Sequence, residues 1–222
     1  MELSAQDAEV CKEDAQVLML EKISNKFAAK LVDTGIISES DADVYVFGFY
    51  QIVMLLLNVV TTLILGAAFQ CVLFCILLNA AYIPIRVSAG GHHADNPVKC
   101  YIHSTLIIAV LLAIIKWITI PSVILVAMLV LSTLVILILA PVETENNPLD
   151  EVEQKVYRRR TIIVLIIELM ICLVCFCLSK GSIVQVIALA LLTESIMLVA
   201  GKVSLGRNSQ THVEYIADEE NN

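Results

Sequence analysis

Six runs of about 20 apolar residues recur along the sequence and constrain the fold more than any other feature. A bilayer core is about 30 Å thick, so a helix needs about 20 mostly apolar residues to cross it. Lipid offers no hydrogen-bonding partners, which restricts spanning chains to helices and closed barrels. The sequence therefore predicts an all-α polytopic membrane protein with about six transmembrane helices. We place these at residues 44–65, 68–85, 102–118, 121–140, 161–179 and 183–200.

Composition supports a membrane protein over a soluble one. The chain has 222 residues, of which 59% are hydrophobic and 16% are charged, whereas about a quarter of the residues in a soluble domain are charged. The first 15 residues are polar and acidic, so we expect no cleavable signal peptide. We predict three segments: a cytoplasmic segment at 1–43, a transmembrane domain at 44–200 and a polar cytoplasmic tail at 201–222.

An amphipathic helix is predicted before the first span, over residues 15–36. Its apolar positions are Leu20, Ile23, Phe27 and Leu31, and the lysines on another face are Lys22, Lys26 and Lys30. This pattern is typical of a helix lying in the membrane interface. The alternative is a small helix that packs on the cytoplasmic ends of the spans. In either case we expect Gly35 to end it.

The basic residues predict the orientation of the chain. Lysine and arginine are retained on the cytoplasmic side of a membrane. Six spans with both termini in the cytoplasm place 12 of the 14 basic residues inside, and leave only Lys116 and Lys180 outside. A fold with four spans and two re-entrant segments is the alternative, since Asn79 and Pro84 interrupt the second run.

The segment from Ser88 to Cys100, called the connector below, carries the strongest signal for chemistry. A thiol nucleophile is activated by a nearby imidazole, and the two groups need to meet only in space. His93 and Cys100 would be about 10.5 Å apart along one straight helix, which is too far for contact. Glycines at 90 and 91 allow a turn, and a proline at 97 disfavours a continuous helix. We therefore predict Cys100 as the nucleophile and His93 as its base.

The surroundings of Cys100 favour a thiolate over a metal ligand. A helix that begins near Cys100 would stabilise the thiolate through its dipole, and Lys99 adds positive charge. The other candidate metal ligands nearby are His92, His93 and His103. Their spacing matches no common zinc pattern, and adjacent histidines cannot easily bind one ion. We expect no metal and no cofactor.

Two motifs resemble those of the AgrB family, the membrane cysteine endopeptidases of Gram-positive quorum-sensing systems. The first motif is Arg86-x3-Gly90-Gly91-His92-His93-Ala94-x5-Cys100, and the second is Ala140-Pro141-Val142-Glu143-x3-Asn147-Pro148-Leu149-Asp150. Size, number of spans and the N-terminal amphipathic helix agree with the family, so the resemblance covers nearly the whole chain. The seven-residue spacing to the cysteine in the family signature selects His93 rather than His92 as the base.

The resemblance implies a substrate and a reaction. The enzyme would cleave an AgrD-like propeptide near its C-terminus and hold the N-terminal part on Cys100 as a thioester. An internal cysteine or serine of the peptide would then close a thiolactone or lactone ring. The implied location is the cell membrane of a Gram-positive bacterium. Gly90 and Gly91 would shape the turn. Arg86 would stabilise developing negative charge or bind a carboxylate; the alternative is a positive-inside anchor.

The group that orients His93 is left open by the sequence. Asp95 is close along the chain, and Glu168 and Glu194 lie within predicted spans, where ionisable residues indicate function. Glu168 lies about two turns into its span, so the alternative is an ion pair with Arg159 or Arg160.

A basic cluster follows the fourth span, formed by Lys155, Arg158, Arg159 and Arg160. Its simplest interpretation is an orientation signal. The alternative is a binding site for the acidic tail of an AgrD-type precursor, because the planar guanidinium suits carboxylates. Acidic residues of the same segment could instead neutralise the cluster internally: Glu143, Glu145, Asp150, Glu151 and Glu153.

Two other function classes compete with a peptidase, namely a multi-span transporter and a non-catalytic scaffold. A transporter would place its polar site near the middle of the bilayer, whereas the connector is predicted at the cytoplasmic face. A scaffold would not need the Gly-Gly-His and cysteine combination. The expected partners are the propeptide and membrane lipid, with no nucleic acid. Small residues such as Ala188 and Ala190 could support a homodimer.

Overall fold

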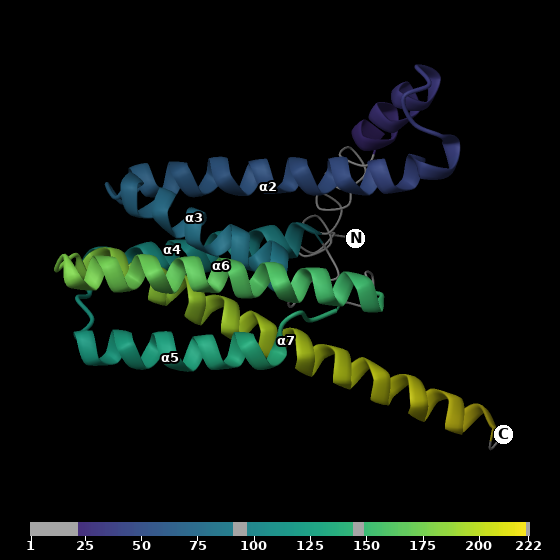
Figure 1. Cartoon of the computed structure of the whole chain (residues 1–222). Coiled ribbons are helices and arrows are strands. Elements are labelled where there is room, and N and C mark those ends of the chain that lie inside the picture. The colour runs from purple at the N-terminus through teal and green to yellow at the C-terminus, as the bar shows by residue number, and fades with distance from the viewer. Residues whose placement is uncertain (1–21, 91–96, 144–148, 221–222) are drawn as a thin grey trace, which may run out of the picture. The chain divides into compact units, whose positions relative to one another are not determined.

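The computed structural model describes residues 22–90, 97–143 and 149–220, and most of them are helical (Figure 1). The described residues contain no strand, which confirms the predicted all-α class. A helix at residues 22–33 precedes a short 3-10 helix and six long helices. These elements are η1 (Glu39–Asp41), α2 (Ala42–Ala68), α3 (Val72–Ala89), α4 (Pro97–Trp117), α5 (Ser122–Leu139), α6 (Glu151–Cys177) and α7 (Gly181–Glu220).

Five of the helices are long and apolar enough to cross a membrane by themselves. They occupy Glu39–Ala68, Val72–Ala89, Ser122–Leu139, Glu151–Cys177 and Gly181–Ser204. The remaining predicted run, the third in chain order at 102–118, falls on α4, whose apolar part is the shorter Tyr101–Trp117. The chain is therefore a polytopic helical membrane protein, as its sequence predicts.

The second span begins later than the sequence predicts. Helix α2 continues to Ala68, and a turn separates it from α3. In that turn Gln70 has a positive φ of 56°, and the Cys71 amide donates a hydrogen bond of 2.8 Å to the Gly66 carbonyl. Asn79 does not interrupt α3, because its side-chain amide donates to the Cys75 carbonyl of the same helix, 2.9 Å away. Pro84 also lies within the continuous helix.

The described residues fall into two compact units. Of the described residues, one unit contains 22–64 and 97–108, and the other contains 65–90, 109–143 and 149–220. In the first unit, the helix at 22–33 ends where Gly35 adopts a φ of 67°, and the Ile36 amide donates to the Leu31 carbonyl. This confirms that glycine ends the N-terminal helix. Phe27 stacks on Phe49 of α2, with ring centroids 4.4 Å apart.

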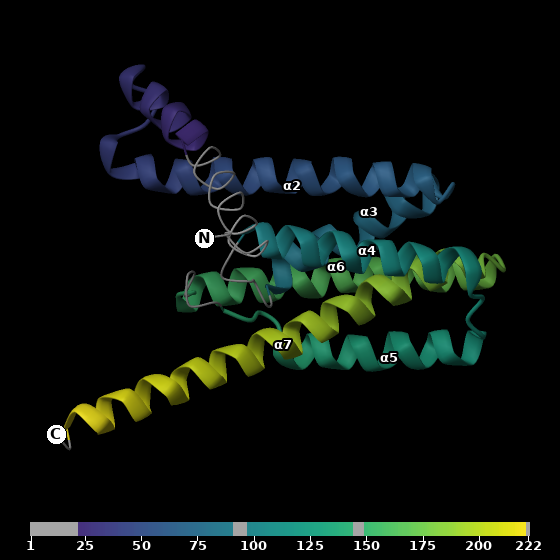
Figure 2. The same cartoon turned by 180° about the vertical axis from the view of Figure 1, so that it is seen from behind.

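Helix α7 forms the centre of the second unit. Every residue from 184 to 191 is buried. Figures 1 and 2 show α7 passing between α5 and α6, and α7 also packs on α3. A helix that is apolar and buried on all sides belongs to the interior of a bundle. Helix α7 is thus the common packing partner of α3, α5 and α6.

Helix α5 has the opposite environment. Its large apolar side chains project outward along its length, with Val123 81% exposed, Leu131 62% and Ile138 73%. A water-soluble protein rarely leaves such a continuous apolar surface exposed. In a bilayer this surface faces lipid tails, which is the environment that apolar side chains prefer.

Gln185 of α7 holds the turn between α4 and α5. Its side-chain oxygen accepts a hydrogen bond from the Ile120 amide at 3.2 Å, and its side-chain nitrogen donates to the Ile118 carbonyl at 2.8 Å. Both backbone groups lie outside regular helix. The buried amide therefore supplies the partners that the turn lacks.

We predict that Gln185→Leu destabilises the protein more than the same change at an exposed position. The two hydrogen bonds are part-buried, and a backbone group that loses its partner away from water costs about 1–3 kcal/mol. Thermal unfolding in detergent micelles measures the effect. Gln154→Leu is the matched control, since Gln154 is exposed on α6 and such changes are usually within about 0.5 kcal/mol. Equal melting temperatures for the two variants would contradict the prediction.

Candidate functional site

The connector, Ser88 to Cys100, begins with the last two residues of α3, which ends at Ala89. Gly90 follows the helix with a φ of 77°, a conformation that favours glycine. Its amide donates to the Arg86 carbonyl at 3.1 Å, and the Arg86 guanidinium nitrogen Nη1 donates back to the Gly90 carbonyl at 2.7 Å. One arginine residue therefore holds both polar backbone groups of Gly90.

A backbone bridge joins this point to the segment that follows α5. Gly90 and Val142 form a parallel bridge, in which the Val142 amide donates to the Ala89 carbonyl at 2.9 Å. A Cβ atom at Gly90 would overlap the Val142 carbonyl oxygen. Gly90 is thus required twice, once for its positive φ and once for the close approach of a second backbone. The bridge brings together the two motifs that resemble the AgrB family.

Arg86 also faces a buried carboxylate. Its Nη1 atom lies 3.9 Å from Oε1 of Glu194 on α7, and the two side chains are 16% and 0% exposed. A surface anchor would be solvated, so this placement differs from the positive-inside role considered for Arg86. The arginine links the core helix α7 to the start of the connector.

The proposed catalytic pair lies largely outside the described residues. Gly91, His92 and His93 belong to the range 91–96, which the structure does not describe. The backbone of Cys100 is described and lies in the first turn of α4, which starts at Pro97. The prediction that a helix begins near Cys100 is confirmed. The contact between His93 and Cys100 stays a prediction.

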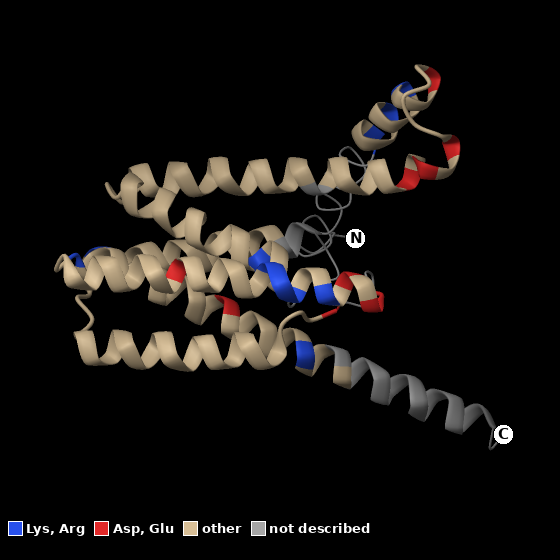
Figure 3. Cartoon of the chain, in the orientation of Figure 1, with Lys and Arg blue, Asp and Glu red and all other residues tan. Residues whose placement is uncertain are grey.

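Glu168 of α6 is the second carboxylate inside the helices, and Figure 3 shows acidic positions within otherwise uncharged stretches of α6 and α7. The Glu168 side chain is buried, and neither carboxylate oxygen has a hydrogen-bond partner among the described residues. The ion pair considered for it with Arg159 or Arg160 is wrong. Both arginines are exposed, and the only ion pair among the described residues joins Arg86 and Glu194.

The basic cluster lies on a helix rather than in a loop, because α6 begins at Glu151. Figure 3 shows these basic positions near the start of α6, and all four side chains are exposed. Asp150 and Glu153 cap α6 by exchanging hydrogen bonds with each other's backbone amides. Glu143 accepts a hydrogen bond from Gln154. Within the described part of the chain, no carboxylate lies within 4 Å of a cation of the cluster.

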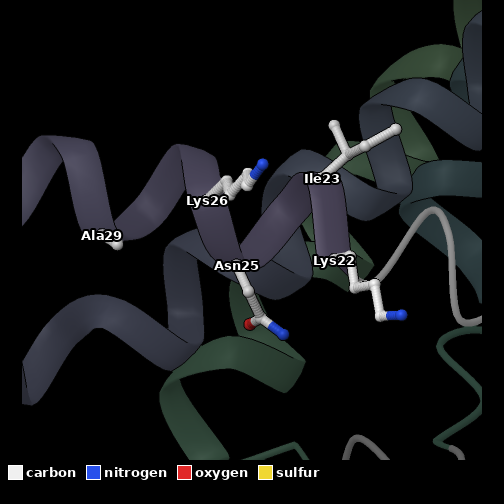
Figure 4. Close-up of a pocket in the computed structure, with 5 residues that line it drawn as sticks. All are labelled: Lys22, Ile23, Asn25, Lys26 and Ala29. Atoms are coloured by element: carbon white, nitrogen blue, oxygen red, sulfur yellow. The ribbon is translucent and has the colours of Figure 1, made fainter.

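The remaining features of the described residues carry no catalytic arrangement. The cysteines of α6 are free thiols, with Cys172 buried and Cys177 exposed. No group of three or more metal-ligating side chains occurs in the described residues. A pocket on the helix at 22–33 is lined by residues of that helix alone (Figure 4). These residues are Lys22, Ile23, Asn25, Lys26 and Ala29. None of them carries a thiol, a hydroxyl or a carboxyl group.

Comparison of the sequence with models of known families identifies the family to which the chain belongs. The model of the family accessory gene regulator B, AgrB, matches residues 21–198. The chain belongs to the AgrB family. A search of curated proteins and a search of solved structures gave no match.

Membership in the AgrB family gives the protein a role in the processing of an accessory gene regulator quorum-sensing signal. The matched range includes the connector, the backbone bridge to Val142, the basic cluster and all six long helices up to residue 198. The three-segment division with boundaries after residues 43 and 200 stays a prediction.

The link between Arg86 and Glu194 was not predicted from the sequence. Glu194 was considered only as a group that could orient His93, and Arg86 as an anchor, a charge stabiliser or a binding group for an unspecified carboxylate. A signal was present, since a carboxylate within one span and a cation at the end of another tend to pair in lipid. The choice of partner needed the packing of α3 against α7.

We predict that Gly90→Ala destabilises this AgrB protein by about 2–5 kcal/mol. The positive φ costs a residue with a Cβ roughly 1–2 kcal/mol, and the overlap with the Val142 backbone adds about 1–3 kcal/mol. Gly35→Ala is the matched control, since Gly35 has a φ of 67° and nothing within 4 Å of its added Cβ. Thermal unfolding in micelles should show the larger loss for Gly90→Ala, and equal losses would mean that the bridge does not need glycine.

Proposed function

We propose that the protein is a membrane-embedded cysteine endopeptidase that cleaves an AgrD-like propeptide near its C-terminus and supports cyclisation to a thiolactone or lactone signal. The observation that carries the proposal is the family match over residues 21–198, which includes His93 and Cys100. The position of Cys100 in the first turn of α4 supports the assignment.

The proposed reaction has two acyl transfers. His93 takes the thiol proton, and the Cys100 sulfur attacks the carbonyl carbon of the scissile peptide bond. The carbon–nitrogen bond breaks, and His93 returns the proton to the amine of the departing C-terminal fragment. An internal thiol or hydroxyl of the peptide then attacks the thioester carbonyl, which closes the ring and frees Cys100. A thioester keeps the acyl group activated, so ring closure needs no further energy source.

The helix start at Pro97 favours the nucleophile. Proline is preferred in the first turn of a helix, where its missing amide hydrogen has no partner to lose. The amides of this turn carry partial positive charge, which stabilises a thiolate. Lys99 adds a full charge beside Cys100. The connector thereby combines a glycine pair, a base and a nucleophilic sulfur in one short segment.

The proposed orientation follows from the basic residues. Both termini and the connector lie on the cytoplasmic side of the cell membrane of a Gram-positive bacterium, where the propeptide is made. The partners are the propeptide and membrane lipid, and a homodimer stays a prediction. A transporter is the competing class, supported by the buried carboxylates of α6 and α7, but it requires no role for Cys100.

We predict that Cys100→Ala and His93→Ala each abolish propeptide cleavage, because nucleophile and base act as one unit. The double variant should be no worse than either single variant. His92→Ala should retain more activity than His93→Ala. Cleavage in proteoliposomes, followed by mass spectrometry of the C-terminal fragment, measures all four variants.

The control is a substrate whose internal nucleophile is changed to alanine. Ring closure is then blocked, and a hydroxylamine-sensitive adduct should accumulate on wild-type protein but not on Cys100→Ala. Substantial cleavage by Cys100→Ala would overturn the peptidase proposal. Free linear peptide without an early adduct would indicate direct hydrolysis instead.

We predict that the basic cluster binds the acidic tail of the propeptide. Lys155→Gln combined with Arg159→Gln removes two charges from one face of α6. Each exposed charge pair is worth about 0.2–1 kcal/mol, so KM should rise several-fold while kcat changes little. High salt should weaken wild-type binding in the same way.

Lys180→Gln is the matched control for this cluster, since Lys180 is an exposed cation at the predicted external side. Cysteine labelling must first establish that each variant has the wild-type orientation. Wild-type KM at every ionic strength in the correctly inserted double variant would mean that the cluster serves orientation alone.

A further inference from the structure

The first unit contains the start of α4, and a hydrogen bond ties this start to α2. The bond joins the Tyr101 hydroxyl to Oγ1 of Thr61, two residues that lie 40 positions apart in the sequence. Both side chains are half-buried. Side chains of neighbouring helices often bond to one another inside a membrane, because lipid offers no other partner. Tyr101 therefore links α4 to α2 directly after Cys100.

Thr61 differs from the threonine next to it. A threonine hydroxyl in a helix commonly bonds to a carbonyl three or four residues earlier in the same helix. Thr62 follows this rule, because its Oγ1 donates to the Val59 carbonyl at 2.9 Å. The Thr61 hydroxyl instead bonds to the hydroxyl of Tyr101, and a tyrosine hydroxyl that is taken out of water needs such a partner. The bond is therefore a contact between two helices.

The side chains in this part of α4 offer little other packing. No side chain from 101 to 107 is buried, and the first buried one after this range is Ile108. Ile102 is 52% exposed and Leu106 is 61% exposed. Side chains that face lipid hold a helix in no particular position against its neighbour, because lipid tails are as apolar as the protein. The hydrogen bond at Tyr101 therefore contributes a large share of what holds this segment.

The start of a helix is also its weakest part. The first four amides of a helix have no partner within it, so the first turn opens more readily than the middle. Helix α4 starts at Pro97, so Tyr101 is the first residue whose amide can bond to a carbonyl of α4 itself. Its Cα atom lies about 3.8 Å from that of Cys100. A contact that holds Tyr101 in place thus holds the backbone of Cys100.

We propose that Tyr101 and Thr61 are positioning residues of the peptidase, whose hydrogen bond holds the first turn of α4, and with it the backbone of Cys100, against α2. This inference rests on the proposed function. Neither hydroxyl touches the substrate or the reacting atoms in this role. A catalytic group that shifts by about 1 Å can lose about a hundredfold in rate. Release of the turn should therefore lower kcat rather than weaken substrate binding.

The test deletes each hydroxyl with little change in the shape of the side chain. Tyr101→Phe and Thr61→Val each remove one partner, and the double variant completes a mutant cycle. Tyr45→Phe is the matched control, since Tyr45 lies on the same helix as Thr61 and is 45% exposed. Thr61→Ser keeps a hydroxyl and tests for rescue. All variants are studied as the full-length protein in lipid nanodiscs.

Three measurements are made on the same samples. Hydrogen–deuterium exchange, read by mass spectrometry, reports the amides of residues 101–105, which are the first that can bond within α4. Propeptide cleavage gives kcat and KM, and thermal unfolding gives the melting temperature. The melting temperature separates a local effect on the first turn from a general loss of stability.

We expect Tyr101→Phe and Thr61→Val each to raise exchange at these amides about three- to tenfold, the effect of losing one hydrogen bond. Each kcat should fall about tenfold while KM stays within about threefold. The double variant should be no worse than either single variant, because both changes delete the same bond. Thr61→Ser and Tyr45→Phe should keep exchange and kcat within about twofold of wild type.

The proposal is overturned by wild-type exchange at residues 101–105 in both single variants, or by raised exchange with wild-type kcat. It is also overturned if the double variant loses the product of the two single losses, or if kcat merely follows the melting temperature. If Thr61→Val does not fold, Tyr101→Phe decides alone, since it deletes the other half of the bond. If cleavage by wild-type protein does not depend on Cys100, the proposed function fails, whereas exchange still decides whether the bond holds the turn.

Discussion

Lipid supplies no hydrogen bonds, so every backbone amide and carbonyl inside the bilayer needs a partner within the protein. The long helices satisfy their own backbone groups, and the turns between them depend on contacts from elsewhere in the chain. Lys116 donates to the Phe69 carbonyl in the turn after α2. Gln185 pairs with both polar groups of the turn before α5. The Val142 amide donates a hydrogen bond to the carbonyl of Ala89, the last residue of α3.

The same constraint explains why the chain carries few charges between helix ends. An ionisable side chain within the membrane-spanning part of a helix must either be paired with an opposite charge or be in its neutral form. Arg86 and Glu194 pair across α3 and α7, and this pairing lies next to the non-helical backbone at Gly90. This ion pair therefore lies where the connector begins, which is also where the proposed function needs a defined backbone.

The sequence predicts the helical class well, because span length is set by one dimension of the bilayer and needs only composition. It predicts boundaries less well. The start of α3 depends on the positive φ of Gln70. Glutamine is not a residue type that indicates this backbone conformation in a sequence. The start of α6 was placed too late, although Asp150 and Glu153 have the spacing of a capping box.

The sequence predicts the reactive residues of the candidate site but not the contacts that hold the backbone beside them. The glycine pair, His93 and Cys100 stand out because reactive residue types gather in one short segment. The contacts of Gly90 with Val142, and of Arg86 with Glu194, join residues that are far apart in sequence. Such pairs follow from how α3, α5 and α7 pack, and a single sequence carries little information on that packing.

The burial of α7 has a consequence for how the protein is made. Helix α7 is synthesised after α3, α5 and α6, yet all three pack on it. These three helices must therefore wait in the membrane without their common partner. Arg86 enters with α3 before Glu194 is made, so the contact between them can form only after α7 has been inserted. Completion of the bundle and formation of the contact between Arg86 and Glu194 then occur at the same step of biogenesis.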